Sequence, residues 1–104
     1  PHKFYTLPVE DISYFYTLNE KVSVWTSDGK QHPVDRNLDA LIEQLDDTLF
    51  FRANRQFIIS RKAIMDIDMW YGSRLSVNLL ISVPERIVIS KNKSPVFKKW
   101  LLMQ

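Results

Sequence analysis

Apolar and polar side chains alternate along the first third of the chain, between Ile12 and Val34. In the clearest stretch, Val22, Val24 and Thr26 alternate with Ser23, Trp25 and Ser27. A period of two places successive side chains on opposite faces of an extended strand, so this stretch predicts β-structure. Asp28-Gly29 follows directly, and this dipeptide is typical of a tight hairpin turn. Residues 12–34 are therefore expected to form a meander of antiparallel strands.

More short strands are expected in the second half of the chain. Apolar residues 51–53 and 57–59 flank a polar corner, Asn54-Arg55-Gln56. Residues 65–69 and 75–79 alternate on either side of a turn, and Ile87-Val88-Ile89 adds a last strand. The chain is therefore predicted to be mainly β, with its short strands joined in hairpins.

Two segments have the three- and four-residue spacing of an amphipathic helix instead. The first helix should begin after Asp35 or Asn37 and pack on the sheet; its apolar positions are Leu38, Leu41, Ile42, Leu45 and Leu49. The second should begin at Ser94-Pro95, with Ser94 as the N-cap and proline in the first helical position. Its expected apolar face consists of Val96, Phe97, Trp100 and Leu101.

The size and composition of the chain indicate a single domain that spans residues 1–104. A chain of 104 residues supports one core, and 45% hydrophobic with 25% charged residues is an ordinary globular balance. No apolar run is long enough for a membrane span or a signal peptide. The absence of cysteine fits a reducing compartment, so we expect a cytoplasmic location and no membrane contact.

The two halves of the chain carry opposite charge, although the formal net charge is only +2. Residues 1–49 contain nine acidic and four basic residues, a balance of −5. Residues 50–104 contain three acidic and ten basic residues, a balance of +7. Solubilising surface charge can produce such a difference, but a basic half is also what a polyanionic partner requires.

Candidate catalytic and cofactor-binding groups are scarce. The two histidines, His2 and His32, are too few for a multi-histidine zinc site, and they provide few candidates for the base of a Ser-His-Asp triad. Two glycines cannot form a glycine-rich phosphate loop. Asp66 and Asp68 could share a magnesium ion, but the wet face of a half-buried strand explains them better. We expect no catalytic residue, no metal site and no cofactor, and the chain is predicted not to be an enzyme.

Two polar segments have the chemistry of nucleic-acid recognition. In the corner, Arg55 offers a rigid fork of donors suited to phosphate or to the O6 and N7 acceptors of guanine, and Asn54 and Gln56 can read adenine. The second segment, residues 90–94, lies before a helix whose N-terminus attracts phosphate. A solvated turn would have the same sequence, so neither segment is decisive alone.

The residues around the corner resemble the signature of a known family. Residues 50–59, FFRANRQFII, resemble the pattern F-x-R-x-H-R-S-[YF]-[IL]-[VI]-N of LytTR domains. Residues 7–15 resemble the opening strands of that family, residues 38–45 its helix, and residues 88–91 and 97–101 its closing V-S-R and F-K-x-W-L elements. The resemblance covers nearly the whole chain. It departs at four positions, where Asn54, Gln56, Ser60 and Lys91 replace the usual histidine, serine, asparagine and arginine.

This resemblance implies an elongated, mainly β fold with two or three short helices, built as a stack of small, mostly antiparallel sheets. It also implies sequence-specific binding of double-stranded DNA for transcriptional regulation, as the output domain of a bacterial two-component response regulator in a phosphorelay. Promoter sites with direct repeats, and a homodimer on the DNA, would follow. The receiver domain that usually precedes such a domain is absent from residues 1–104.

The resemblance also implies which residues contact DNA. Asn54, Arg55 and Gln56 would enter one major groove. Lys91, Asn92 and Lys93 would enter an adjacent groove. Asn19 and Lys21, in the turn Asn19-Glu20-Lys21, would make a third contact.

Two other functions fit the same sequence. A protein-interaction module could pair through an open sheet with exposed aromatic side chains such as Tyr14, Tyr16 or Trp25. A β domain that binds single-stranded RNA would stack such side chains on unpaired bases. The salt dependence of binding distinguishes a protein-interaction module from a DNA-binding domain. Affinity for DNA must fall steeply as the salt concentration rises, whereas an apolar protein interface should change little.

Overall fold

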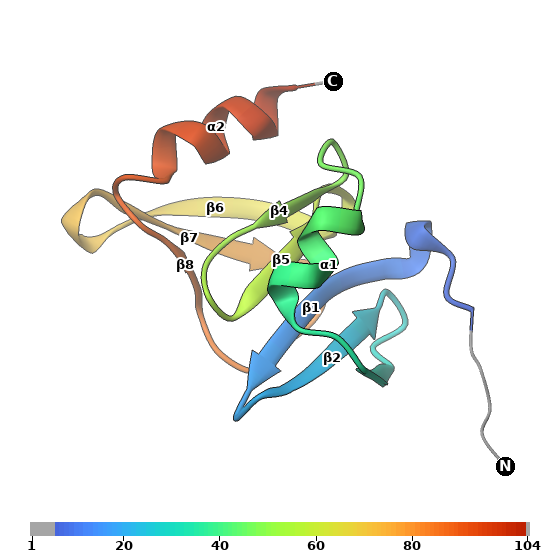
Figure 1. Ribbon diagram of the computed structural model, residues 1–104. Coiled ribbons are helices and arrows are strands. Elements are labelled where there is room, and N and C mark those ends of the chain that lie inside the picture. The colour runs from blue at the N-terminus through green and yellow to red at the C-terminus, as the bar shows by residue number, and fades with distance from the viewer. Residues whose placement is uncertain (1–5, 104) are drawn as a thin grey trace, which may run out of the picture.

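The computed structural model describes residues 6–103, which form two antiparallel sheets, two α-helices and three single-turn 3-10 helices, at Val9–Asp11, Arg61–Ala63 and Tyr71–Ser73 (Figure 1). The five-stranded sheet has the strand order β3-β2-β1-β5-β4, and the three-stranded sheet has the order β6-β7-β8. The molecule measures 49 × 31 × 25 Å along its principal axes and is therefore elongated. The fold class expected from the sequence, mainly β with short helices and small antiparallel sheets, is confirmed.

The larger sheet contains the predicted meander. Its strands are β1 (Ile12–Leu18), β2 (Lys21–Thr26), β3 (Gln31–Val34), β4 (Phe50–Arg52) and β5 (Phe57–Ser60). Asn19 and Glu20 alone connect β1 to β2, and both have positive φ (51° and 65°), as a type I′ turn requires. Gly29, with a φ of 83°, lies in the turn that Asp28-Gly29 predicted between β2 and β3.

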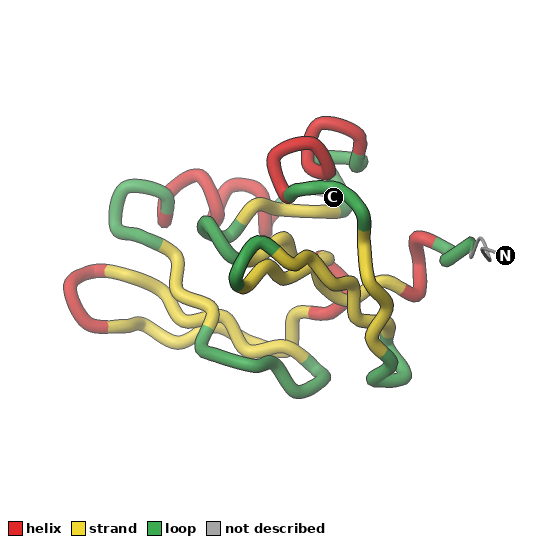
Figure 2. The backbone as a smooth tube through the Cα atoms, turned by 60° about the horizontal axis from the view of Figure 1, so that its bottom comes forward, coloured by secondary structure: helices red, strands yellow, loops and turns green. Residues whose placement is uncertain are grey.

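The smaller sheet consists of β6 (Ile64–Trp70), β7 (Arg74–Leu79) and β8 (Ile87–Ile89). The β6–β7 hairpin projects beyond the other elements at one end of the molecule, at the left of Figure 2. The predicted burial of β6 is only partly correct. Ile67 is half-buried, but Met69 is 77% exposed and Met65 is also exposed. Met65 lies at a register shift between Ile64 and Asp66, and Met69 lies near the tip of the projecting hairpin.

The first helix, α1 (Leu38–Gln44), is shorter than the sequence predicted. It begins as expected, because the Asn37 side chain accepts a hydrogen bond from the backbone N–H of Ala40 and caps it. It ends before Leu49, because Asp46 Oδ1 accepts hydrogen bonds from both the N–H and the hydroxyl of Thr48. Such a local turn competes with the helical backbone pattern.

The second helix, α2 (Ser94–Leu102), follows β8 as predicted, but the N-cap assigned to Ser94 is wrong by one residue. Lys93 is the N-cap and Ser94 is already helical and buried. Ser90 accepts a hydrogen bond from the Lys93 N–H and so closes the preceding turn. Val96 is exposed, so it does not belong to the buried face of α2. No helix formed by residues 6–103 has the length and apolar character needed to cross a membrane.

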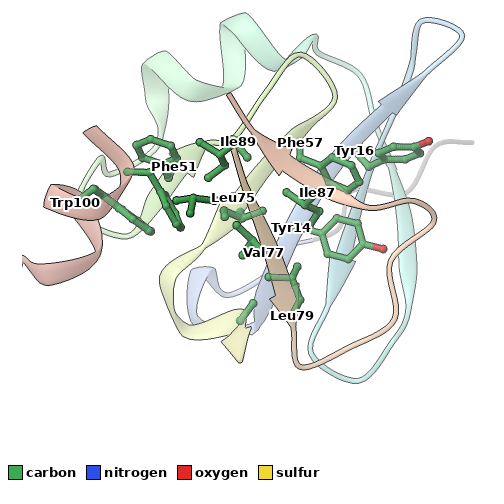
Figure 3. Close-up of a cluster of buried hydrophobic side chains, with 14 residues drawn as sticks. Tyr14, Tyr16, Phe51, Phe57, Leu75, Val77, Leu79, Ile87, Ile89 and Trp100 are labelled. Atoms are coloured by element: carbon green, nitrogen blue, oxygen red, sulfur yellow. The ribbon is translucent and has the colours of Figure 1, made fainter. Parts of the chain in front are cut away.

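The core lies on both faces of the larger sheet, because side chains of β1 and β5 alternate between two clusters. One cluster packs under α1; its buried members are Ile12, Phe15, Val22, Val24, Leu38, Phe50 and Ile58. The other cluster joins the two sheets and α2; Figure 3 shows, among others, Tyr14, Phe51, Phe57, Val77, Ile87 and Trp100 directed toward one another. The strands β4 and β5, which flank the corner, are therefore packed on both faces of the sheet.

Candidate nucleic-acid interface

The structure brings the three predicted contact segments onto one continuous surface. The corner between β4 and β5 and the loop before α2 lie on the same side of the molecule (Figure 1). A hollow of about 490 Å³ lies between them; we call it the loop-side hollow, and its lining includes Arg52, Asn54, Arg55, Arg74, Ser90 and Lys93. A second hollow, of about 570 Å³, lies between the corner and the β1–β2 turn; this turn-side hollow is lined by residues that include Asn19, Glu20, Asn37, Arg55 and Gln56.

Arg55 lies between the two hollows, because it lines both of them. Its side chain is exposed, and among residues 6–103 no group accepts a hydrogen bond from its guanidinium. A free guanidinium can donate to two acceptors in one plane, such as the two acceptors on the major-groove edge of guanine. The geometry therefore leaves Arg55 available for an external ligand.

Arg52 and Asn54 hold the backbone that carries Arg55. The Arg52 guanidinium donates to the carbonyl oxygens of Asn54 (2.6 Å) and Arg55 (3.1 Å), and it forms an ion pair with Asp39 at 2.8 Å. Asn54 Oδ1 accepts from the backbone N–H groups of Gln56 (2.8 Å) and Phe57 (3.1 Å). The corner is therefore a preorganised turn and not a loose loop. The arginine of the F-x-R pattern has a structural role that the sequence did not reveal.

Asn54 also connects the corner to the smaller sheet, since its Nδ2 donates to the carbonyl oxygen of Val88 at 2.9 Å. Three of the hydrogen-bonding positions of this amide are thus occupied within the protein. One N–H remains for a ligand, so a two-bond contact with adenine from Asn54 would require these internal bonds to break.

Gln56 takes part in a short polar chain on the turn side of the corner. Its Nε2 donates to Glu85 at 3.2 Å, and the hydroxyl of Tyr16 donates to the same carboxylate oxygen. The hydrogen bond to Glu85, together with burial, raises the pKa of Tyr16 to about 12. No group among residues 6–103 donates to the side-chain carbonyl oxygen of Gln56, so this oxygen can accept a hydrogen bond from a ligand.

The loop before α2 presents Lys91 and Asn92 to solvent, whereas Lys93 is half-buried. Lys93 Nζ lies 5.5 Å from the centroid of the Phe51 ring. Burial and the nearby positive charge of Arg52 lower the pKa of Lys93. Both effects disfavour the charged ammonium, so an anion placed beside Lys93 would relieve them.

The third predicted contact, the β1–β2 turn, presents the exposed side chains of Asn19 and Lys21. Glu20 lies between them and lines the turn-side hollow, so this part of the surface is less basic than the loop side.

Some of the basic residues of the second half serve the fold instead of the surface. Arg61 lies 4.0 Å from the Trp100 ring centroid and donates to the carbonyl oxygens of Thr48 and Leu101. Arg86 lies 3.8 Å from the Trp70 ring centroid and donates to Ser76. The balance of +7 therefore overstates the charge that is free to meet a polyanion.

One candidate contact residue was missed at the level of sequence. Arg74 begins β7 at the tip of the β6–β7 hairpin, yet it lines the loop-side hollow together with Arg55 and Lys93. The alternation predicted a strand over residues 75–79, which begins one residue after Arg74. No local signal relates this hairpin to a corner about twenty residues earlier in the chain.

The aromatic side chains that the alternative functions required are not exposed. Tyr14 and Tyr16 are buried, and Trp25 is half-buried and stacks on Tyr14 with ring centroids 4.9 Å apart. The expectation that they lie on an open sheet face was wrong, because a second sheet covers that face. They cannot serve as a stacking platform for bases without a rearrangement of the core.

Comparison with known proteins defines the class of this domain. The family model for the LytTr DNA-binding domain matches residues 2–102. In structure, the chain superimposes on the LytTr DNA-binding domain of a putative methyl-accepting/DNA response regulator from Bacillus cereus, with a TM-score of 0.80 and 21% identity over 93% of this chain and 86% of that chain. The fold and the sequence pattern therefore agree, and the chain belongs to the LytTR family of DNA-binding domains.

A curated relative is longer than this chain. The sensory transduction protein LytT of Enterococcus faecalis is 25% identical over 99 residues, which are 95% of this chain. The match covers 40% of the length of that relative.

Proposed function

We propose that this domain binds double-stranded DNA in a sequence-specific manner and regulates transcription through the surface around Arg55. The observation that carries the proposal is the free guanidinium of Arg55, held by a braced corner between two hollows. Membership of the LytTR family supports DNA as the ligand. A side chain with unused donors, carried by a preorganised backbone, is the kind of group that can distinguish one base pair from another.

The surrounding residues divide into base-reading and backbone-binding groups. Arg55 reads a base in one major groove, with the free oxygen of Gln56 as a second probe and the remaining N–H of Asn54 as a third. Lys91, Asn92 and Lys93 meet the DNA at an adjacent groove, and Asn19 and Lys21 meet the backbone beyond the turn-side hollow. Phosphate contacts of this kind position a protein on the duplex, while base contacts specify the sequence.

The relative and the structural match support a response-regulator context. We propose that a phosphoacceptor receiver domain precedes residues 1–104 in the whole protein, and that the domain acts in the bacterial cytoplasm on promoter sites arranged as direct repeats. Two copies bound side by side would form the homodimer on DNA. The domain itself supplies DNA binding and no catalysis.

The proposal is tested by duplex selection followed by salt titration. A duplex selected from a randomised library would be labelled and titrated with the chain, beside its separated strands and an RNA strand of the same sequence. If the surface neutralises about four phosphates, affinity for the duplex should fall roughly a hundredfold between about 50 and 200 mM salt. Equal affinity at both salt concentrations, or tighter binding to the RNA strand, would contradict the proposal.

A further inference from the structure

We propose that the loop-side hollow holds one phosphate of the DNA backbone between Lys93 and Arg74, so that the tip of the β6–β7 hairpin is a fourth contact element. This inference rests on the proposed function. It goes beyond that function by adding Arg74 and by assigning a specific ligand group to the hollow.

The lining of the hollow has the charge that such a ligand requires. It contains four basic side chains, Arg52, Arg55, Arg74 and Lys93, and no carboxylate. Arg52 is already committed to Asp39 and to the backbone of the corner. Arg55 projects between the two hollows and is assigned to a base. Lys93 and Arg74 are the cations that remain for a phosphate.

Arg74 is held in position by the turn that precedes it. Its Nε donates to the carbonyl oxygen of Tyr71 at 2.7 Å, which leaves both terminal nitrogens of the guanidinium for another acceptor. Gly72 and Ser73 both have positive φ (69° and 61°), a conformation that is uncommon for serine. The guanidinium folds back over this turn, since a Cβ on Gly72 would lie 3.7 Å from the Arg74 Nε.

The end of the hairpin next to the turn is braced as well. The Arg86 guanidinium stacks on Trp70, 3.8 Å from its ring centroid, and donates to Ser76 at 3.0 Å. This brace links the edge strand β6 to β7 just behind the turn. Both strand ends that flank the turn before Arg74 are therefore held together.

Lys93, the second cation assigned to the phosphate, has no carboxylate partner among residues 6–103. Among residues 6–103 no carboxylate lies within ion-pair distance of its ammonium, and the charge that acts on it is the positive charge of Arg52. Burial and this repulsion depress its pKa. A phosphate in the hollow would supply the missing negative charge and accept hydrogen bonds from both Lys93 and Arg74.

The test compares three variants with a matched control. The variants are Arg74→Gln, Lys93→Gln and the double variant; the control is Lys62→Gln, an exposed lysine on the turn Arg61–Ala63 outside the lining of the hollow. Each single variant should bind the selected duplex about three- to tenfold more weakly, and Lys62→Gln should bind nearly as the wild type does. Circular dichroism confirms that each variant is folded.

The salt dependence distinguishes one shared phosphate from two separate ones. If both residues hold the same phosphate, the double variant should lower the slope of log K against log salt by about one unit. A decrease of about two units would mean two phosphates and would overturn the shared site. If Arg74→Gln binds the selected duplex with unchanged affinity, the tip of the hairpin does not contact the DNA.

A neutral phosphate analogue locates the contact on the DNA. Methylphosphonate groups would replace the phosphates of the selected duplex one at a time. We expect one position at which neutralisation weakens wild-type binding but leaves binding of the double variant unchanged. If no position behaves in this way, the inference is wrong even when the wild type binds the duplex as proposed. If the wild type shows neither sequence preference nor salt dependence, the proposed function itself fails.

Free phosphate is the other source of the same chemistry. Chloride would be exchanged for inorganic phosphate at constant ionic strength, with the selected duplex as the probe. Unchanged affinity supports a site shaped for the DNA backbone. A loss of affinity in the wild type that is absent in the double variant would show that free phosphate competes with a phosphate of the DNA backbone for the same hollow.

Discussion

Replacement of Trp100 by alanine should destabilise the domain more than almost any other single change. The indole is 6% exposed and joins α2 to the larger sheet. Its ring centroid lies 5.2 Å from that of Phe51 and 6.0 Å from that of Phe97. Its Nε1 donates to the carbonyl oxygen of Asp47 at 2.7 Å, and Arg61 covers the ring.

The expected cost follows from these contacts. Truncation of a buried Phe or Trp to alanine lowers the free energy of unfolding by about 3–5 kcal/mol. The lost hydrogen bond adds little, because Asp47 is exposed and water can replace the indole N–H. For a domain of this size, about 3 kcal/mol corresponds to a decrease of roughly 12 °C or more in the melting temperature.

Urea denaturation followed by circular dichroism measures the change. Leu102→Ala is the matched control on the same helix, since Leu102 is 80% exposed and its loss should cost less than about 0.5 kcal/mol. Trp100→Phe keeps most of the ring and should lie between the two. If Trp100→Ala costs no more than Leu102→Ala, the indole does not join α2 to the sheet, and the reasoning from its contacts is wrong.

Two further predictions concern polar contacts that do not involve the Arg55 side chain. The pKa of Tyr16 in the folded protein is about 12, above its ordinary value of 10.0, so the stability that Tyr16 contributes is intact below about pH 10 and is lost as the pH rises through about 12. Glu85→Gln should lower the pH at which the phenolate absorbance of Tyr16 appears. If that pH does not change, Glu85 is not the cause of the raised pKa. Asp66 and Asp68 both accept hydrogen bonds from Asn78 on the smaller sheet, and neither lines a hollow. The double variant Asp66→Asn/Asp68→Asn should therefore bind the selected duplex with unchanged affinity. A tenfold change in affinity would place both residues in the interface.

Elements with a strong local pattern were predictable from the sequence. The meander, the corner and the β6–β7 hairpin follow from alternation and turn residues, and Asn37 and Trp100 have the cap and core roles that their spacing indicated. The errors occurred where another interaction overrides the pattern. The turn closed by the Asp46 side chain ends α1 early, and the methionines of β6 are exposed because one lies at a register shift and the other near the hairpin tip.

The candidate site was predictable in its segments but not in its assembly. The corner and the loop before α2 have a composition that indicates nucleic-acid contact. Which side chains are free depends on contacts between distant residues. Asn54 donates a hydrogen bond to Val88, and Arg52 forms an ion pair with Asp39. Arg74 belongs to the smaller sheet and lines the loop-side hollow. None of these pairings produces a periodic signal along the chain.

The role of Arg55 is tested most directly by titration of Arg55→Ala against the selected duplex and a panel of duplexes that each differ from it by one base pair. Lys93→Ala is the comparison, since a phosphate contact carries no base information. If Arg55 reads a base, its loss should cost about 1–3 kcal/mol on the selected duplex and remove discrimination at one position, whereas Lys93→Ala should weaken all duplexes alike. If Arg55→Ala weakens every duplex equally, Arg55 is a backbone contact and does not read a base.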